Sequence, residues 1–139
     1  MMVKTEYIEF NTKGPGDIVN MTAEIQSVVG KSGITAGTVT VFAPGSTTGI
    51  TTIEYEPGLL RDLPQLMEKL VPSDRSYSHD ETWGDGNGFS HLRSAMIGCD
   101  MTVPFDGGKL LLGTGQQIVF CEFDNRARHR RVILQIMGE

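Results

Sequence analysis

The chain of 139 residues has a formal net charge of -5 at pH 7 and a hydrophobic content of 39%. This length suits a single domain, residues 1–139, with a core of its own. The acidic balance argues against a nucleic-acid partner, and no segment approaches the ~18 apolar residues of a membrane span. The first residues contain no apolar run of the signal-peptide type, so we expect a cytoplasmic protein without membrane contact.

The N-terminal quarter carries a strand pattern followed by a helix pattern. Residues 3–10 place apolar groups at intervals that fit a half-buried strand, and the segment from Gly14 to Gly16 ends it. Asp17 is a good N-cap, and apolar residues then recur at three- and four-residue steps up to Gly30. We therefore expect a helix that begins after Asp17 and stops at Gly30.

Two strands and a second helix follow. Threonine, valine and isoleucine dominate residues 35–43 and 46–55, a composition typical of strands. Pro57 suits the first turn of a helix, and leucines at helical spacing continue the pattern to Leu70. The sequence therefore predicts a helix over residues 57–70.

The second half contains a polar loop, a short helix from Phe89 to Ile97 and several short strands. Apolar stretches that alternate with turns are typical of an antiparallel meander. The expected strands cover residues 101–105, 109–112, 117–123 and 131–137. Early helices followed by late strands predict an α+β class, in which an antiparallel sheet or sandwich packs with two to three helices.

The stretch from Tyr77 to His91 holds two of the three histidines and the only tryptophan. Its glycines let the backbone fold back, so that His79, Asp80, Asn87 and His91 can face one point. Such groups suit either acid-base and substrate contacts or a divalent metal, Mg²⁺ or Zn²⁺, held by the two histidines. The aromatic rings of the stretch require apolar surroundings, which a fully solvated loop does not give.

Two further segments suit an anion. Ser46, Thr47 and Thr48 form a hydroxyl-rich turn flanked by glycines, and its amides could hold a phosphate. Arg130 and Arg131 belong to a basic cluster near the C-terminus, and guanidinium groups match phosphate or carboxylate. The alternatives are that the threonines simply form a strand and that the basic cluster is a charged turn followed by the exposed face of a strand. As a binding site, these residues would hold a small phosphorylated molecule.

Gln116 follows two closely spaced glycines between late strands, where the backbone approaches either a ligand or another chain, or simply forms a hairpin turn. Cys99 and Cys121 stand in apolar settings without CxxC spacing. We expect two buried free thiols instead of a disulfide or a zinc knuckle.

Taken in order, these segments resemble the YjbQ-like family, often called the secondary thiamine-phosphate synthase family. The resemblance covers nearly the whole chain, which makes it more specific than any single motif. The segments that carry it are Gly45–Glu54, Leu59–Asp62, Tyr77–Asp80, His91–Gly98, Val103–Pro104, Leu112–Ile118 and Arg130–Gly138.

The resemblance implies an α+β fold and a compact homotrimer with sites near its subunit interfaces. It also implies a weak thiamine-phosphate synthase activity, which joins a pyrimidine pyrophosphate to a thiazole phosphate and releases pyrophosphate. The family's site residues fall here on Glu54, Asp62, Tyr77, His79, Asp80, His91, Arg130 and Arg131.

Three positions depart from the family pattern. Many members carry a histidine where this chain has Gly45 and another where it has Phe123, and a tryptophan where it has Gly115. If histidines at those positions bind a metal elsewhere in the family, half of the imidazole ligands are missing here. We therefore favour His79 and His91 as substrate or acid-base residues over a metal cage. The alternative function is a homotrimer that binds a small molecule or a divalent metal without physiological turnover.

Overall fold

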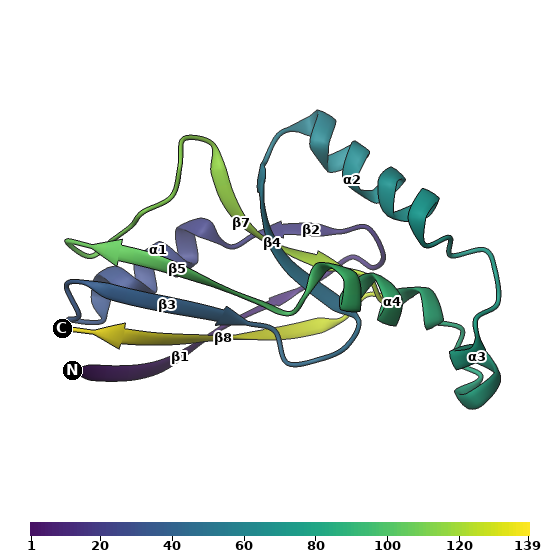
Figure 1. Ribbon diagram of the computed structural model, residues 1–139, viewed down its shortest axis with the longest axis horizontal. Helices are drawn as coiled ribbons and strands as arrows, with labels where there is room; N and C mark the ends of the chain where they lie inside the picture. Colours follow the sequence, from purple (N-terminus) through teal and green to yellow (C-terminus); the bar gives the residue numbers. More distant parts are fainter.

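Two antiparallel sheets and four helices make up the computed structural model, which describes residues 1–139 (Figure 1). The larger sheet has the order β1 (Met2–Asn11), β8 (His129–Gly138), β3 (Gly37–Phe42), β5 (Asp100–Asp106) and β6 (Lys109–Leu110). The smaller sheet has the order β2 (Ile18–Asn20), β7 (Gln116–Glu122) and β4 (Thr48–Glu54). The helices are α1 (Thr22–Lys31), α2 (Pro57–Leu70), α3 (Ser78–Trp83) and α4 (Gly88–Ile97). The α+β class is confirmed, with four helices instead of two or three.

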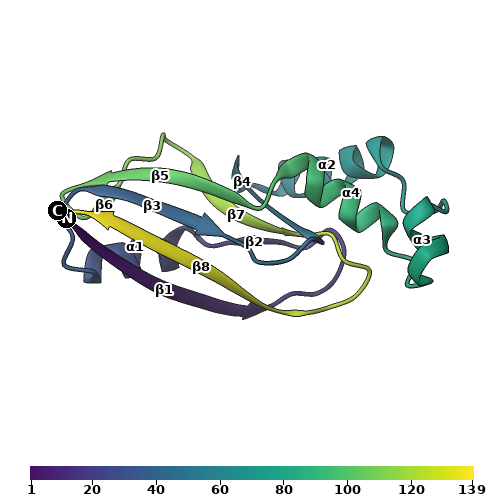
Figure 2. The same cartoon turned by 60° about the horizontal axis from the view of Figure 1, so that its bottom comes forward.

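The main core lies between the larger sheet on one side and the smaller sheet with α1 on the other (Figure 2). Val132, Leu134 and Ile136 of β8 are fully buried, while the residues between them face outward. This alternation follows from the two-residue period of a strand. Ile25 and Val29 of α1 complete the core from the other side.

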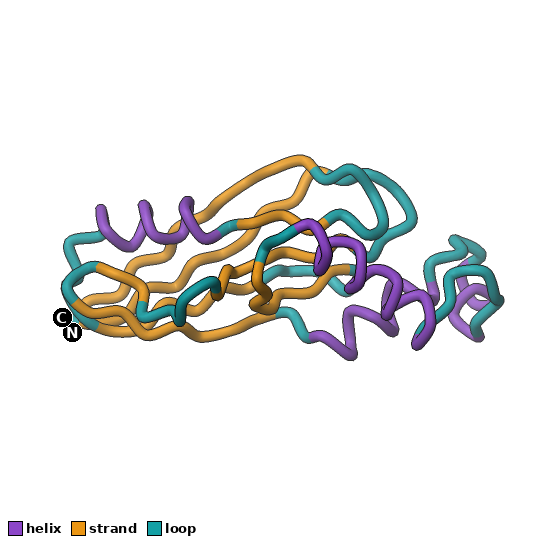
Figure 3. Tube along the Cα trace, turned by 90° about the horizontal axis from the view of Figure 1, so that it is seen from above, coloured by secondary structure: helices purple, strands orange, loops and turns teal.

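The central strand of the smaller sheet, β7, is buried on both faces. Ile118 and Phe120 point into the main core, whereas Val119 and Cys121 point into a second core that contains Met67 of α2. A strand covered on both faces reads as an uninterrupted apolar run. Figure 3 shows one helix beside the chain termini and the others gathered at the opposite end of the sheets.

The helix at residues 57–70 is confirmed as α2, and the short helix near residues 89–97 as α4. The start of α2 is fixed locally, because the Glu56 carboxylate accepts hydrogen bonds from the amides of Gly58 (2.8 Å) and Leu59 (2.6 Å). No helix is both long and apolar enough to cross a membrane.

The first helix begins later than its sequence pattern predicts. It starts at Thr22, and Ile18–Asn20 pair with β7 as the short strand β2. Asp17 does not cap the helix; its carboxylate accepts the amide of Lys13 at 2.9 Å. Ile18 is buried in the second core as part of a strand, so long-range pairing overrides the local helical pattern.

The expected meander of late strands is wrong. Only β5 and β6 are neighbours in sequence and in a sheet, because β7 lies between β2 and β4 whereas β8 lies between β1 and β3. The burial of these strands explains their separation. With two apolar faces, β7 requires cover on both sides, whereas β8 has a single apolar face and belongs to the outer sheet.

The two free cysteines differ in accessibility. Cys121 exposes 2% of its surface, and burial raises the pKa of its thiol to about 12, whereas Cys99 is half-buried. The expectation of two buried thiols therefore holds for Cys121 only. We expect a disulfide-exchange reagent to modify one thiol in the native protein and both in denaturant, as followed by absorbance. Rapid modification of both thiols without denaturant would contradict this assignment.

Candidate functional site

The two histidines of the glycine-rich stretch lie side by side. His79 on α3 and His91 on α4 have ring centroids 4.3 Å apart, with ring planes tilted by 49°. Figure 2 shows α3 and α4 beyond the end of the sheets. Both imidazoles face a cavity of about 280 Å³. Its other lining residues are Tyr77, Ser78, Gly88 and Leu92.

The Asp80 carboxylate binds backbone amides of this stretch and does not orient an imidazole. Its Oδ2 accepts the amide of Tyr77 at 2.9 Å, and its Oδ1 accepts the amide of Gly88 at 2.9 Å. These two hydrogen bonds lower the pKa of Asp80. Gly88 has no room for a side chain, since a Cβ there would lie 2.7 Å from that of Tyr77. Asp80 thus closes the turn that brings His79 beside His91.

The lowered pKa of Asp80 predicts that its two hydrogen bonds to the Tyr77 and Gly88 amides, here called the clamp, depend on pH. The ionised carboxylate stabilises the turn fully above the ordinary aspartate pKa of about 3.9. This stabilisation is lost as pH falls through the lower pKa of the folded state. We expect the Gly88 amide proton, which the hydrogen bond shifts downfield, to move upfield only as pH falls below about 4. An NMR pH titration checks this, with Asp80→Asn as control. The same Gly88 titration in that variant would contradict the clamp.

Asn87 is buried beside His79, and its amide fits in two ways. In one, the amide oxygen accepts from His79 Nε2 at 3.0 Å and the nitrogen donates to Asp124 Oδ1 at 3.4 Å. In the other, the nitrogen donates to His79 Nε2 at 3.0 Å and to Asp85 Oδ1 at 3.1 Å. We assign the second, because it keeps the 3.0 Å hydrogen bond with His79 and replaces the 3.4 Å bond to Asp124 with a 3.1 Å bond to Asp85. It places the proton of neutral His79 on Nδ1.

A buried ion pair lies below the turn between β3 and β4. Arg130 donates through Nε and Nη2 to the two carboxylate oxygens of Glu122, at 2.8 and 2.6 Å. Its Nη2 also donates to Thr47 Oγ1 at 3.0 Å. Glu122 is fully buried. The sequence carries a signal for it that was missed: strand alternation puts Glu122 on the same face as Ile118 and Phe120, where a carboxylate requires a cationic partner.

Asp124 extends this polar network toward the histidines. It exposes 1% of its surface and pairs with Arg128, whose Nε and Nη2 lie 2.7 Å from Oδ2. Burial raises the pKa of Asp124, but hydrogen bonds from the Asn125 amide and from Arg128 outweigh burial and lower the pKa overall. The Asn87 amide lies between this carboxylate and His79, so the polar network borders the histidine pair without a hydrogen bond to it.

The turn that precedes β4 leaves hydrogen-bond donors free. The amides of Gly45, Ser46 and Thr47 donate to no acceptor in the chain. Arg130 also has one unused nitrogen, Nη1, and a Cβ placed on Gly45 would lie 4.0 Å from it. The turn borders an open cavity of about 300 Å³, which it shares with His91. Consecutive free amides beside a guanidinium are an arrangement suited to an anion.

Arg131 and Thr48 do not face this cavity. Arg131 follows Arg130 on β8 and therefore points to the opposite face of the sheet, where its guanidinium lies 3.7 Å from the centre of the Tyr7 ring. Thr48 anchors α4 to β4, because its carbonyl accepts the Ser94 hydroxyl at 2.5 Å. Of the hydroxyl-rich turn, Ser46 alone lines the cavity.

Glu54 and Gln116 lie far from the histidines within one chain. They face each other in the ladder of β4 and β7, and Gln116 Nε2 donates to Thr52 Oγ1 at 3.2 Å. The opposite end of that ladder is the pair of Thr48 and Glu122, beside the buried ion pair. Six residue steps of a strand separate the two ends, or roughly 20 Å.

The residues of one chain do not form a metal cage. No group of three or more His, Cys, Asp and Glu side chains is arranged to hold a metal ion. Asp85, whose Oδ1 lies 3.3 Å from His79 Nε2, is the only carboxylate within 4 Å of a ring nitrogen of that imidazole. Gly45 supplies no ligand, and Phe123 is buried in the second core, against Gly49.

The aromatic rings of the stretch have different surroundings. Phe89 is buried, with Arg93 stacked at 4.9 Å, whereas Trp83 exposes 74% of its surface. The expectation that these rings are buried is therefore wrong for Trp83, which lies at the end of the short helix α3.

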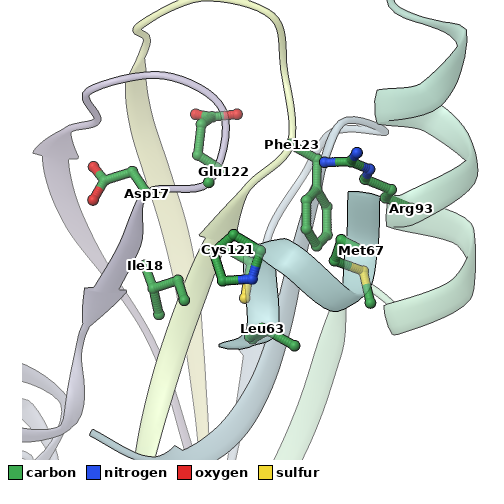
Figure 4. A pocket seen from close by; sticks show the side chains of 10 residues that line it. Asp17, Ile18, Leu63, Met67, Arg93, Cys121, Glu122 and Phe123 are labelled. Carbon is green, nitrogen blue, oxygen red and sulfur yellow. The ribbon is translucent and has the colours of Figure 1, made fainter. Parts of the chain in front are cut away.

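The pocket beside Cys121 (Figure 4) has a volume of about 10 Å³. It can hold about one water molecule and is too small for a ligand.

Residues 6–139 match the protein family described as UPF0047 protein YjbQ-like. A UPF0047 protein of Archaeoglobus fulgidus is 40% identical over 121 residues, which are 87% of this chain and 91% of that protein. The UPF0047 protein YugU of Bacillus subtilis is 30% identical over 138 residues, 99% of this chain and 100% of that protein. A YbjQ-like protein of unknown function from Sulfolobus solfataricus has a crystal structure that matches with a TM-score of 0.89 and 28% identity, over 99% of this chain and 100% of that chain.

Proposed function

Because the chain belongs to the UPF0047 family of YjbQ-like proteins, we propose that it is a low-activity transferase of the thiamine-phosphate synthase type. In this reaction the thiazole nitrogen forms a bond to the methylene carbon of the pyrimidine, and the bond from that carbon to the diphosphate oxygen breaks. Pyrophosphate leaves with the electron pair. A single observation carries the proposal: His91 lines both the cavity of the histidine pair and the cavity of the free amides.

Different groups of the site serve different parts of this reaction. Negative charge grows on the leaving diphosphate, and the free amides of Gly45, Ser46 and Thr47 with Arg130 Nη1 supply donors for it. An imidazole beside that group can position or protonate it, and His91 borders the same cavity.

A direct assay tests the role of the histidines. We expect pure protein to form thiamine phosphate from the two substrates, and His79→Ala and His91→Ala to lose roughly 10²-fold or more in rate, as expected for acid-base groups. His129→Ala is the matched control, because His129 is exposed and binds Asn11 and Glu9 away from the site. Equal rates in all four proteins would remove both histidines from the mechanism.

The proposed active form is a homotrimer with sites composed from two subunits. The supporting observation is the position of Glu54 and Gln116, which lie at the far end of the β4–β7 ladder, roughly 20 Å from the end beside Thr48 and Glu122, and line neither cavity of the histidines. If all four act on one substrate, the two groups come from different subunits. Mixing and reassociating the inactive His79→Ala and Glu54→Ala proteins should then restore part of the activity. No recovery, with mixed oligomers verified by mass spectrometry, would contradict a shared site.

The second candidate is a binding protein without turnover. This function is favoured because the Asp80 carboxylate already accepts hydrogen bonds from two backbone amides. Glu81 is then the one carboxylate of α3 that could act as an acid or a base. This function predicts bound ligand but no product in the same assay. Elemental analysis of the purified protein tests whether a divalent ion accompanies it.

The free cysteines fit the cytoplasmic location that we propose for either function.

A further inference from the structure

Gly45 lies next to the guanidinium of Arg130. Its φ of +143° lies in a region that side-chain-bearing residues rarely adopt. The nearest atom to a Cβ built there would be Arg130 Nη1, at 4.0 Å. Any side chain at this position would therefore strain the turn and extend beside the one guanidinium nitrogen that makes no hydrogen bond.

The cavity beside Gly45 contains no acidic side chain, although the protein as a whole carries a net charge of -5. Its lining residues are Gly45, Ser46, His91, Ser94, Ala95, Gly98 and Cys99. The carboxylates nearest to Arg130 are those of Glu122 and Asp124, which are buried and committed to their own cations. The donors at the cavity are the turn amides, the Ser46 hydroxyl and the His91 imidazole, and Arg130 Nη1 adjoins them at Gly45. This set suits an anion.

We propose that Gly45 makes this cavity a subsite for a diphosphate or phosphate-ester group, by leaving Arg130 Nη1 and the amides of the turn uncovered. The inference rests on the proposed phosphate-handling function and names the residue that determines its specificity. A cavity of about 300 Å³ is at the small end of ligand sites, so it suits the phosphorylated part of a substrate rather than the whole molecule.

Calorimetric titration with inorganic pyrophosphate tests the subsite. Gly45→Ala should weaken binding by roughly tenfold to a hundredfold, because the strain of a side chain at a φ of +143° displaces the turn and costs the ligand about one hydrogen bond. Gly33→Ala is the matched control, because Gly33 also has a positive φ (+78°) and nothing lies within 4 Å of its Cβ position. It carries a similar backbone strain and should bind pyrophosphate as the wild type does.

A second variant tests the subsite even if Gly45→Ala does not fold. Ala95→Asp adds a carboxylate to the cavity from the exposed side of α4, without backbone strain. Its negative charge should also weaken pyrophosphate binding, by roughly tenfold or more. Unchanged affinity in both cavity variants would overturn the subsite and the role of these donors toward the leaving diphosphate, whereas the thiamine phosphate assay decides the transferase activity separately. No pyrophosphate binding by the wild type would overturn the subsite and the phosphate-handling function together. Binding that depends on Gly45, without thiamine phosphate formation, would support the subsite and reject the transferase.

Discussion

Replacement of Arg130 by methionine is expected to destabilise the protein by about 3–5 kcal/mol, because it leaves a buried carboxylate without its cation. Glu122 exposes none of its surface, and Arg130 reaches both of its oxygens. The other groups that bind this carboxylate are the Thr12 hydroxyl at 2.8 Å and the Asp124 amide at 3.0 Å. Both are neutral, so neither replaces the lost charge.

The neighbouring arginine supplies the control. Arg131→Met removes the same charge from the same strand, but Arg131 is exposed and stacks on Tyr7. Its loss should cost below about 1 kcal/mol. Urea denaturation of both variants measures the difference in the free energy of unfolding. Equal losses for the two variants would show that Glu122 does not depend on Arg130.

Replacement of Gly37 by alanine is expected to cost on the order of 3 kcal/mol, since it forces two central strands apart. Gly37 of β3 is opposite Gly138 of β8, and a Cβ on Gly37 would lie 1.9 Å from the carbonyl oxygen of Met137. That atom belongs to the backbone, so a change of side-chain rotamer cannot relieve the clash. The two strands must separate, which weakens their hydrogen bonds.

A glycine in open space should respond in the opposite direction. Gly30 lies on the exposed side of α1, and the nearest atom to its Cβ position is 3.9 Å away. Gly30→Ala should stabilise the protein by about 0.5–1 kcal/mol, because alanine restricts the unfolded chain and favours a helix. Thermal unfolding of the two variants checks the pair. Similar effects from both substitutions would contradict the close approach of β3 and β8.

Elements with local signals follow from the sequence, and those fixed by distant partners do not. The bounds of α2 are predicted because Pro57 and the leucine pattern act within the helix itself. The strand Ile18–Asn20 is missed because its helical pattern competes with pairing to β7, about a hundred residues later in the chain. The positions of β7 and β8 in different sheets depend on how many faces each strand buries, which the order of strands alone does not reveal.

The candidate site divides in the same way. Glycines around His79 and His91 indicate that the stretch can fold back, and the imidazoles do lie together. The basic cluster alone does not indicate that the Arg130 side chain points toward the core. Strand alternation does predict that Arg130 and Arg131 lie on opposite faces of β8. The approach of Gly45 to Arg130 Nη1 depends on the fold alone, because Gly45 lies 85 positions earlier in the chain.

The most direct measurement is an NMR titration of ¹⁵N-labelled protein with pyrophosphate. If the turn before β4 holds the phosphorylated group, the largest saturable shifts will fall on the amides of Gly45, Ser46 and Thr47, with a smaller shift at His91. Saturable shifts centred instead on the outer face of the larger sheet, around Arg131, would contradict an anion site at this turn, as would the absence of any saturable shift there.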